Sequence, residues 1–172
     1  MITIISGTNR EGSYSIKFAL KYAEILIDKG VSCQVLDLKD LPKNFLFSET
    51  YGKRTDSYEQ LLKKYVYDPN KWMMVSPEYN GSFSGVLKSF IDSIDYRAVK
   101  GKKIAMIGVA AGKSGNLRGM DHMTNCMHYM GAEVMPNKLP ISQAFKMFDG
   151  DTLMDEDTLK LMEAHAEEFI KY

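Results

Sequence analysis

Short apolar runs alternate with segments of helical periodicity along the chain, and this alternation limits the possible folds more than any other feature. The apolar runs predict strands at 2–6, 31–38, 72–76, 103–110 and 132–135. Apolar residues spaced three and four positions apart predict helices at about 16–27, 57–67, 86–94, 117–130 and 159–170. Strands that alternate with helices form a parallel sheet covered by helices on both faces. We therefore expect an α/β fold.

The length and composition of the chain fit one domain, residues 1–172. A chain of this size buries roughly 70% of its unfolded surface, which is enough for a core without disulfides or metals. Hydrophobic residues make up 45% of the sequence and charged residues 26%. These proportions are typical of a globular protein.

The charge balance and the apolar pattern exclude several classes of partner. The 22 Lys and Arg residues balance 22 Asp and Glu residues, so the net charge gives no reason to expect nucleic acid. No apolar stretch approaches the ~20 residues that span a bilayer. The sequence starts directly in an apolar run without a charged leader, and we expect a cytoplasmic protein. Cys33 and Cys126 are too few for a disulfide framework or a zinc cluster, and both are expected to be reduced thiols.

Three polar, glycine-rich segments follow predicted strands, at 6–15, 76–85 and 110–116. Because crossovers between parallel strands are right-handed, all strand-to-helix loops lie at the carboxyl edge of the sheet. Ligands of such folds bind at this edge. The three segments together therefore predict a ligand site.

The first segment, SGTNREGSYS, combines two glycines, four serine or threonine side chains and Arg10 just before a predicted helix. Unpaired N–H groups at a helix N-terminus carry a partial positive charge, and a guanidinium forms paired hydrogen bonds with phosphate. One interpretation is therefore a phosphate site. The other is an ordinary capped helix, with Ser13 or Ser15 as the cap and Arg10 in water.

Two common phosphate motifs are missing from the sequence. The dinucleotide fingerprint needs a third glycine, and the first loop offers only Gly7 and Gly12. The P-loop pattern would end at 112–114, but its first glycine would fall on Ile107. We therefore expect neither a dinucleotide-binding fold of the usual type nor an NTPase.

The second segment, SPEYNGS, favours a planar ligand. Pro77 restricts Ser76 to an extended backbone, and Asn80-Gly81 readily adopts positive φ angles. Backbone amides in such a turn can face the polar edge of a heterocycle, and Tyr79 adds a flat surface. The alternative is an ordinary turn with a surface tyrosine.

With these motifs the chain resembles the NAD(P)H-dependent FMN reductase family of flavodoxin-like proteins, which includes flavin, quinone, azo-dye and chromate reductases. The resemblance rests on GTNREGSYS and on SPEYNGSFSGVLKSFID, and it continues through IAMIGVAAGKSGNLRGMDHM and YMGAEVMP. It implies a doubly wound, five-stranded parallel sheet in the flavodoxin order 2-1-3-4-5. It also implies bound FMN, with NADPH or NADH as co-substrate.

The resemblance also assigns residues to the cofactor. It puts the FMN phosphate on four residues of the first loop: Thr8, Arg10, Ser13 and Ser15. It puts the isoalloxazine ring on five residues of the second loop, mainly through their backbone: Pro77, Glu78, Tyr79, Asn80 and Gly81. Three residues of the third loop would lie near the other edge of the ring: Gly112, Lys113 and Ser114.

If FMN binds, the cofactor carries the chemistry, and no catalytic residue is expected. The nicotinamide would pass a hydride to the flavin and leave before a small-molecule electron acceptor enters, which predicts ping-pong kinetics. The spacing of His122, His128 and His165 favours no metal site. The family implies a homodimer or a homotetramer. The alternative function is a non-catalytic electron carrier or a redox-sensing regulatory module, although the zero net charge disfavours a carrier.

Three further features lead to separate expectations. Phe83 is bulkier than the family pattern suggests and would narrow the space above the ring. The loop at 39–54, with Phe45, Phe47 and Tyr51, could be a lid or a partner surface. The methionines of the 117–130 helix are most simply core residues, with a subunit contact as the alternative.

Overall fold

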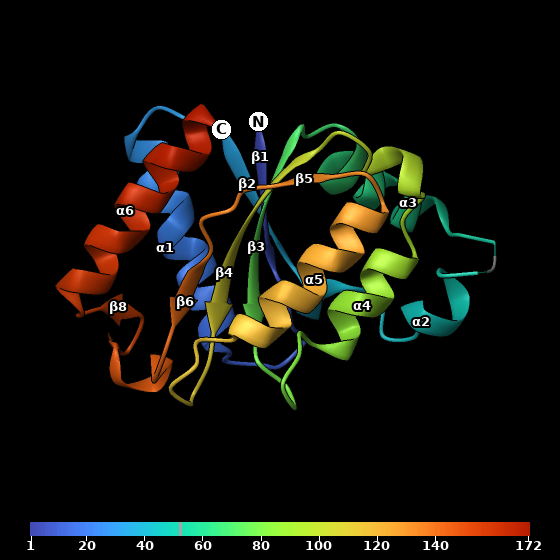
Figure 1. Cartoon of the computed structure of the whole chain (residues 1–172). Coiled ribbons are helices and arrows are strands. Elements are labelled where there is room, and N and C mark those ends of the chain that lie inside the picture. The colour runs from blue at the N-terminus through green and yellow to red at the C-terminus, as the bar shows by residue number, and fades with distance from the viewer. Residues whose placement is uncertain (52) are drawn as a thin grey trace.

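The sheet has six parallel strands with helices on both faces (Figure 1): five follow the order β2-β1-β3-β4-β5, and β6 pairs with β4. The computed structural model describes residues 1–51 and 53–172. The strands of the sheet are β1 (Ile2–Ser6), β2 (Cys33–Asp37), β3 (Lys71–Pro77), β4 (Lys103–Val109), β5 (Glu133–Val134) and β6 (Leu139–Ile141). The longer helices are α1 (Tyr14–Asp28), α3 (Asp56–Leu62), α4 (Gly85–Asp92), α5 (Leu117–Tyr129) and α6 (Glu156–Lys171). This order confirms the predicted flavodoxin-like topology.

The parallel register brings the ends of three strands to one edge of the sheet. Ser6, the last residue of β1, pairs with Val75 of β3. Pro77, the last residue of β3, pairs with Val109 of β4. The polar loops that follow these strands therefore start side by side, as the sequence predicts.

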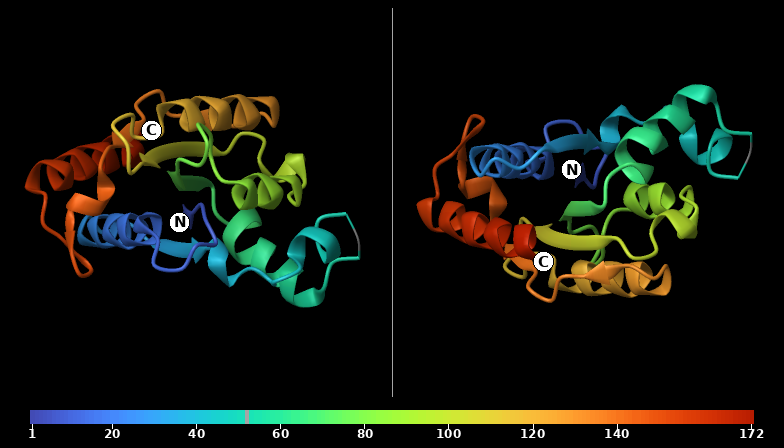
Figure 2. Two further views of the ribbon diagram at one scale, coloured as in Figure 1. Left: turned by 90° about the horizontal axis from the view of Figure 1, so that it is seen from below. Right: turned by 90° about the horizontal axis from the view of Figure 1, so that it is seen from above.

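The two faces of the sheet have separate cores. On one face, β-strand residues such as Ile4 and Ile107 pack against α1 and α6; on the other, residues such as Ile5 and Met106 pack against α3, α4 and α5. Figure 2 shows the two helix layers from either end of the sheet. The side chains of alternate residues in each strand belong to opposite cores. Both faces of the sheet are therefore apolar, as expected for a fully covered parallel sheet.

Local hydrogen bonds define where the helices begin. Ser13 caps α1 by accepting from Ile16 N at 3.3 Å, and Ser84 caps α4 by accepting from Leu87 N at 3.2 Å. Each cap satisfies one of the amides that a helix N-terminus leaves without a partner. These caps place the first turns of both helices at the carboxyl edge of the sheet.

The methionines of α5 belong to the core. Met120, Met123 and Met127 are fully buried between α5 and the sheet. This confirms the prediction of core packing for the stripe. Their flexible side chains fill the irregular space between helix and strands.

The segment between β5 and the last predicted helix contains β6, a strand that the sequence did not predict. This strand pairs with β4 through Leu139 and Ile141, with Pro140 opposite Gly108. A proline is tolerated on an edge strand, where its missing N–H is not needed for the sheet. A small hairpin, β7 (Phe148–Asp149) with β8 (Thr152–Leu153), also follows where no strand was predicted.

The segment at 39–54 is more ordered than a simple loop, and residue 52 lies outside the described part. It includes a short 3-10 turn, η1 (Leu38–Asp40), and a four-residue helix, α2 (Phe45–Ser48). Phe45 is buried, whereas Phe47 and Tyr51 are largely exposed. The predicted helix at 57–67 is α3 followed by one π-helical turn, η2 (Lys63–Tyr67).

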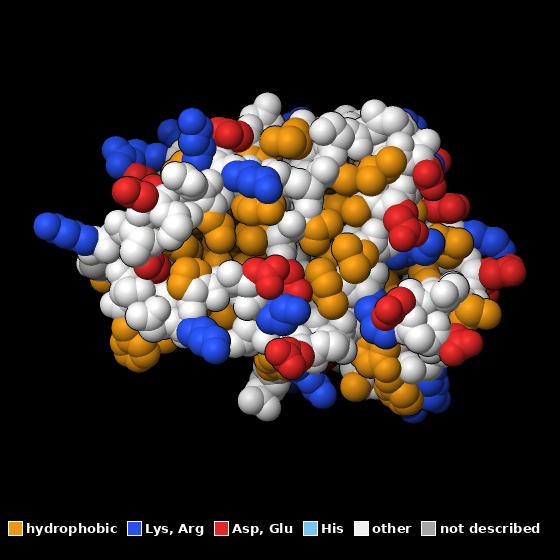
Figure 3. All heavy atoms as spheres, turned by 180° about the vertical axis from the view of Figure 1, so that it is seen from behind, with side chains coloured by type: hydrophobic (Ala, Val, Ile, Leu, Met, Phe, Trp, Pro, Cys, Tyr) orange, Lys and Arg blue, Asp and Glu red, His pale blue; other side chains and the backbone are white. Residues whose placement is uncertain are grey.

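Surface features agree with the balanced composition. On the face shown in Figure 3, basic and acidic side chains are interspersed without a large area of one sign.

None of the described helices is both long enough and apolar enough to cross a lipid bilayer. Cys33 and Cys126 are free, partly buried thiols that pack against the two cores.

Candidate functional site

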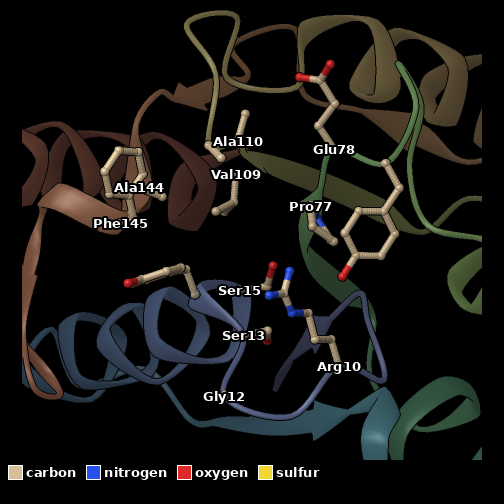
Figure 4. A pocket seen from close by; sticks show the side chains of 13 residues that line it. Arg10, Gly12, Ser13, Ser15, Pro77, Glu78, Val109, Ala110, Ala144 and Phe145 are labelled. Carbon is tan, nitrogen blue, oxygen red and sulfur yellow. The ribbon is translucent and has the colours of Figure 1, made fainter.

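A pocket of about 340 Å³ lies at the carboxyl edge of the sheet, between the three polar loops and a short turn, η4 (Ala144–Lys146) (Figure 4). This volume is within the ~300–1,000 Å³ of small-molecule sites. The lining residues are Arg10, Gly12, Ser13, Tyr14, Ser15, Pro77, Glu78, Tyr79, Val109, Ala110, Ala111, Ala144 and Phe145. The pocket combines a polar end at α1 with a mostly apolar and aromatic wall.

The polar end of the pocket is built on the N-terminus of α1. The Arg10 side chain extends over the first turn of this helix toward Ser15 (Figure 4). No salt bridge among the described residues includes Arg10. A guanidinium without a carboxylate partner, beside the positive end of a 15-residue helix, favours an anion at this end of the pocket.

Ser15 is the clearest indication that this end binds an acceptor group. Its side chain is only 1% exposed, and its Oγ has no hydrogen-bond partner among the described residues. An unpaired buried hydroxyl costs ~1–3 kcal/mol, and such groups are rare in native proteins. An anionic oxygen in the pocket would provide the missing acceptor. The residues at this end therefore fit a phosphate-bearing cofactor. Ser13 meanwhile caps the helix, so capping and anion binding are compatible here.

Thr8 lies behind the pocket rather than on its surface. It is fully buried, and its Oγ1 accepts a hydrogen bond from Arg10 N at 3.2 Å. The same Oγ1 lies 2.9 Å from the phenol oxygen of Tyr79. The first and second loops are therefore joined by a direct side-chain contact.

The second loop forms a tight hairpin turn. Tyr79 and Ser82 exchange backbone hydrogen bonds of 2.8 and 3.1 Å, and the two residues between them have positive φ angles, +51° at Asn80 and +78° at Gly81. This is the geometry of a type I′ turn, which favours Asn-Gly. Glu78 N donates to Val109 O at 2.9 Å, which ties the start of the turn to β4. Neither Asn80 nor Gly81 lines the pocket itself.

The third loop contacts the second, but its predicted residues lie outside the pocket lining. Ser114 Oγ donates to Glu78 Oε2 at 3.0 Å. Lys113 is exposed, and Gly112 O accepts from Gln143 N at 3.0 Å. The pocket wall from this loop consists instead of Ala110 and Ala111.

Several lining residues were not predicted from the sequence. Ala144 and Phe145 follow β6, and they were missed because no strand was predicted there. A strand at 139–141 would have brought the next residues to the same edge of the sheet. Tyr14, the first residue of α1, also lines the pocket beside Ser13 and Ser15.

Phe83 does not narrow the pocket, so that expectation is wrong. Its side chain is only 6% exposed and belongs to the core beneath α4 and α5. Its ring lies 5.1 Å from the ring of His122, whose Nδ1 contacts Ser82 Oγ at 2.8 Å. The turn directs residue 83 inward, and the sequence alone does not reveal on which side of a turn a side chain lies. Within the described part of the chain, no three His, Cys, Asp or Glu side chains gather as a metal site.

Comparison with known families identifies the class of protein. The model of the NADPH-dependent FMN reductase family matches residues 1–146. The chain belongs to this family of oxidoreductases, which confirms the predicted enzyme class and its cofactors, FMN and NAD(P)H.

Individual relatives agree with this family. The chain is 29% identical to the NAD(P)H-dependent FMN reductase PA1204 of Pseudomonas aeruginosa over 92% of this chain and 87% of that protein. It is 25% identical to the 2-hydroxy-1,4-benzoquinone reductase of a Burkholderia species over 98% of this chain and 93% of the relative. Among solved structures, FerB, a flavoenzyme NAD(P)H:(acceptor) oxidoreductase from Paracoccus denitrificans, shares the fold with a TM-score of 0.82 at 21% identity, covering 99% of this chain and 95% of that one.

Proposed function

We propose that this protein is an FMN-dependent oxidoreductase that takes electrons from NADPH or NADH and passes them to a small acceptor. The observation that carries the proposal is the unpaired Ser15 hydroxyl beside Arg10, at the α1 N-terminus, in a pocket with aromatic walls. One end of this pocket suits a phosphate, and the other suits a planar ring. Family membership supports the same cofactor.

At the phosphate end, three side chains would hold the cofactor. Arg10 supplies a paired, permanently charged donor, and Ser15 supplies a hydroxyl that is already desolvated. Ser13 accepts from Ile16 N through its oxygen, which leaves its hydroxyl hydrogen free to donate into the pocket. The partial charge of the helix adds to this set.

At the ring end, the second loop would act mainly through backbone groups. Glu78 N and Tyr79 N already have partners inside the protein, at Val109 O and Ser82 O. The amides of Asn80 and Gly81 have no such partner among the described residues, and they are the donors left in this turn. Pro77 and Tyr79 supply flat apolar surface, and Ser114 holds Glu78 through its hydroxyl. Gly112 and Lys113 of the same loop would lie near the other edge of the ring.

FMN, held at its phosphate by Arg10, Ser13 and Ser15, would supply the redox chemistry between the nicotinamide and an acceptor, which would use the same place in turn. The residues of this chain bind, orient and enclose the reactants, and no side chain is assigned a proton-transfer step. The shared place predicts ping-pong kinetics. A free flavin, a quinone, an azo compound or a metal oxyanion would serve as acceptor, and the relatives include a benzoquinone reductase and an azoreductase.

The cytoplasmic location and the homodimeric or homotetrameric assembly stay predictions. Size-exclusion chromatography with light scattering tests the assembly. A monomer at working concentration would contradict it.

The function itself is tested on the purified protein with added FMN. We expect a yellow 1:1 complex, oxidation of NADPH or NADH that depends on a quinone, and parallel lines when reciprocal rates are plotted at several acceptor concentrations. A protein that binds FMN but oxidises neither nicotinamide would instead be a carrier or a redox-sensing module. A protein that fails to take up FMN would contradict both functions.

A further inference from the structure

The contact between Thr8 and Tyr79 has a direction that the surrounding structure determines. Thr8 is fully buried, and its Oγ1 already accepts from Arg10 N. Tyr79 is 36% exposed and lines the pocket. The two hydroxyl oxygens are 2.9 Å apart, so one of the two O–H groups must donate to the other oxygen.

Counting donors distinguishes the two possible directions. Each hydroxyl carries one hydrogen, and the contact uses only one of the two. If Tyr79 donated to Thr8, the Thr8 hydrogen would be buried without an acceptor, which is unfavourable. If Thr8 donates to Tyr79, the hydrogen left over belongs to Tyr79 and faces the pocket. The second direction leaves no buried donor unpaired.

On this basis we propose that Thr8 is a positioning residue that sets Tyr79 as a hydrogen-bond donor to the phosphate of the bound cofactor. The inference rests on the proposed function. It differs from the expectation that Thr8 itself binds the phosphate, because Thr8 is not part of the pocket lining and its hydroxyl is engaged behind it. Thr8 acts on the cofactor through the phenol of Tyr79.

The location of the Thr8–Tyr79 pair indicates that the phenol of Tyr79 meets the phosphate of the cofactor rather than its ring. Thr8 Oγ1 also holds the backbone amide of Arg10, the cation of that end. The phenol oxygen of Tyr79 therefore lies next to the first loop, although its backbone belongs to the second. One hydroxyl pair thus couples the loop that binds the phosphate to the loop that holds the ring.

The test compares FMN with riboflavin, which lacks the phosphate, by quenching of flavin fluorescence. Tyr79→Phe removes only the phenol oxygen from a half-exposed side chain, so the variant folds. We expect it to weaken FMN binding by about ten-fold, because hydrogen bonds to charged groups are strong, and to leave riboflavin binding unchanged. Thr8→Val should weaken FMN binding at least as much. Adding Tyr79→Phe to Thr8→Val should cost less than about two-fold more, since the two residues act as one unit.

Thr8→Ser keeps the hydroxyl and should restore FMN affinity. Tyr58→Phe is the matched control, because the Tyr58 phenol contacts Ser93 Oγ at 2.6 Å far from the pocket. A loss in Thr8→Val without a loss in Tyr79→Phe would overturn the inference, and so would losses that multiply in the double variant. Equal losses for FMN and riboflavin would also overturn it, because they would indicate a general loosening of the loops. A wild-type protein that binds neither flavin would instead contradict the proposed function.

Discussion

The backbone oxygen of Gly115 occupies the space that a side chain on Gly108 would need. A Cβ atom at residue 108 would also come within 2.9 Å of Met120 Cε and 3.0 Å of Asn116 Cβ. Gly108 belongs to β4, and Gly115 follows in the third polar loop. The loop that borders the pocket therefore packs directly on the strand it leaves.

Gly108→Ala is expected to destabilise the protein by at least about 1–3 kcal/mol, because the new methyl group meets backbone that cannot move aside easily. Urea unfolding followed by circular dichroism measures the change. Gly85→Ala is the control, since a Cβ there meets nothing within 4 Å and φ is not in the left-handed region. It should be neutral or stabilising by up to ~1 kcal/mol. Equal stabilities of the two variants would contradict the close packing.

Arg10→Ala is expected to weaken FMN binding about ten- to a hundred-fold, since a hydrogen bond to a charged group contributes ~1.5–3 kcal/mol. Folding should change little, because Arg10 is exposed and in no salt bridge among the described residues. Arg10→Lys should recover only part of the affinity, since an ammonium group lacks the paired donors. Fluorescence titration with FMN measures the effect. Arg97→Ala, which removes only an exposed partner of Asp95, should leave FMN binding unchanged.

Ser15→Ala is expected to affect binding and folding in opposite directions. Removing a buried hydroxyl without a partner should stabilise the flavin-free protein by up to ~1 kcal/mol. FMN affinity should nevertheless fall about ten-fold, because the phosphate loses a donor. Thermal unfolding of the flavin-free protein and FMN titration give the two values. Ser89→Ala, in which a hydroxyl bonded to Gly85 O is lost on α4, should not alter FMN affinity. A flavin-free Ser15→Ala protein that is clearly less stable would show that the hydroxyl has a structural partner.

His165 should make the stability depend on pH. Burial lowers the pKa of His165 to about 4 from its usual 6.5, and its Nδ1 lies 2.9 Å from Tyr22 OH. Because the unfolded chain then binds a proton more readily, the free energy of unfolding should fall as the pH drops from 6.5 to 4, by an amount on the order of 3 kcal/mol. Below pH 4 this contribution no longer changes.

The measurement is urea unfolding across this pH range in the wild type and in His165→Gln. The wild type should lose more stability than the variant between pH 6.5 and pH 4. His128→Gln, at an exposed position near the end of α5, should follow the wild type. Parallel curves for the wild type and His165→Gln would show that the pKa of His165 is the same in the folded and the unfolded protein.

Most of the fold could be predicted because the strands that contribute to both cores are continuous apolar runs in the sequence. Strands such as 103–110 are buried on both faces, and they can be recognised without knowing which strands pair with them. The last edge strand could not be found this way. It is three residues long and has Pro140 at its centre, so its local signals favour a loop.

The site was predictable where function depends on local backbone geometry. The Asn80-Gly81 turn and the Ser13 cap follow from residue preferences that act within a few positions. Phe145 and the inward direction of Phe83 depend instead on contacts between distant segments. The same holds for Thr8, whose partner Tyr79 lies 71 positions along the chain.

Pro140 also affects whether copies of this protein can pair through the edges of their sheets. Leu139 and Ile141 pair inward with β4, so the nitrogen of the proline between them faces away from the sheet. That nitrogen has no hydrogen, and an incoming extended segment finds no amide there to bind. The β6 edge of the sheet is thus a poor template for pairing with another strand, which disfavours fibre-like self-association through this edge.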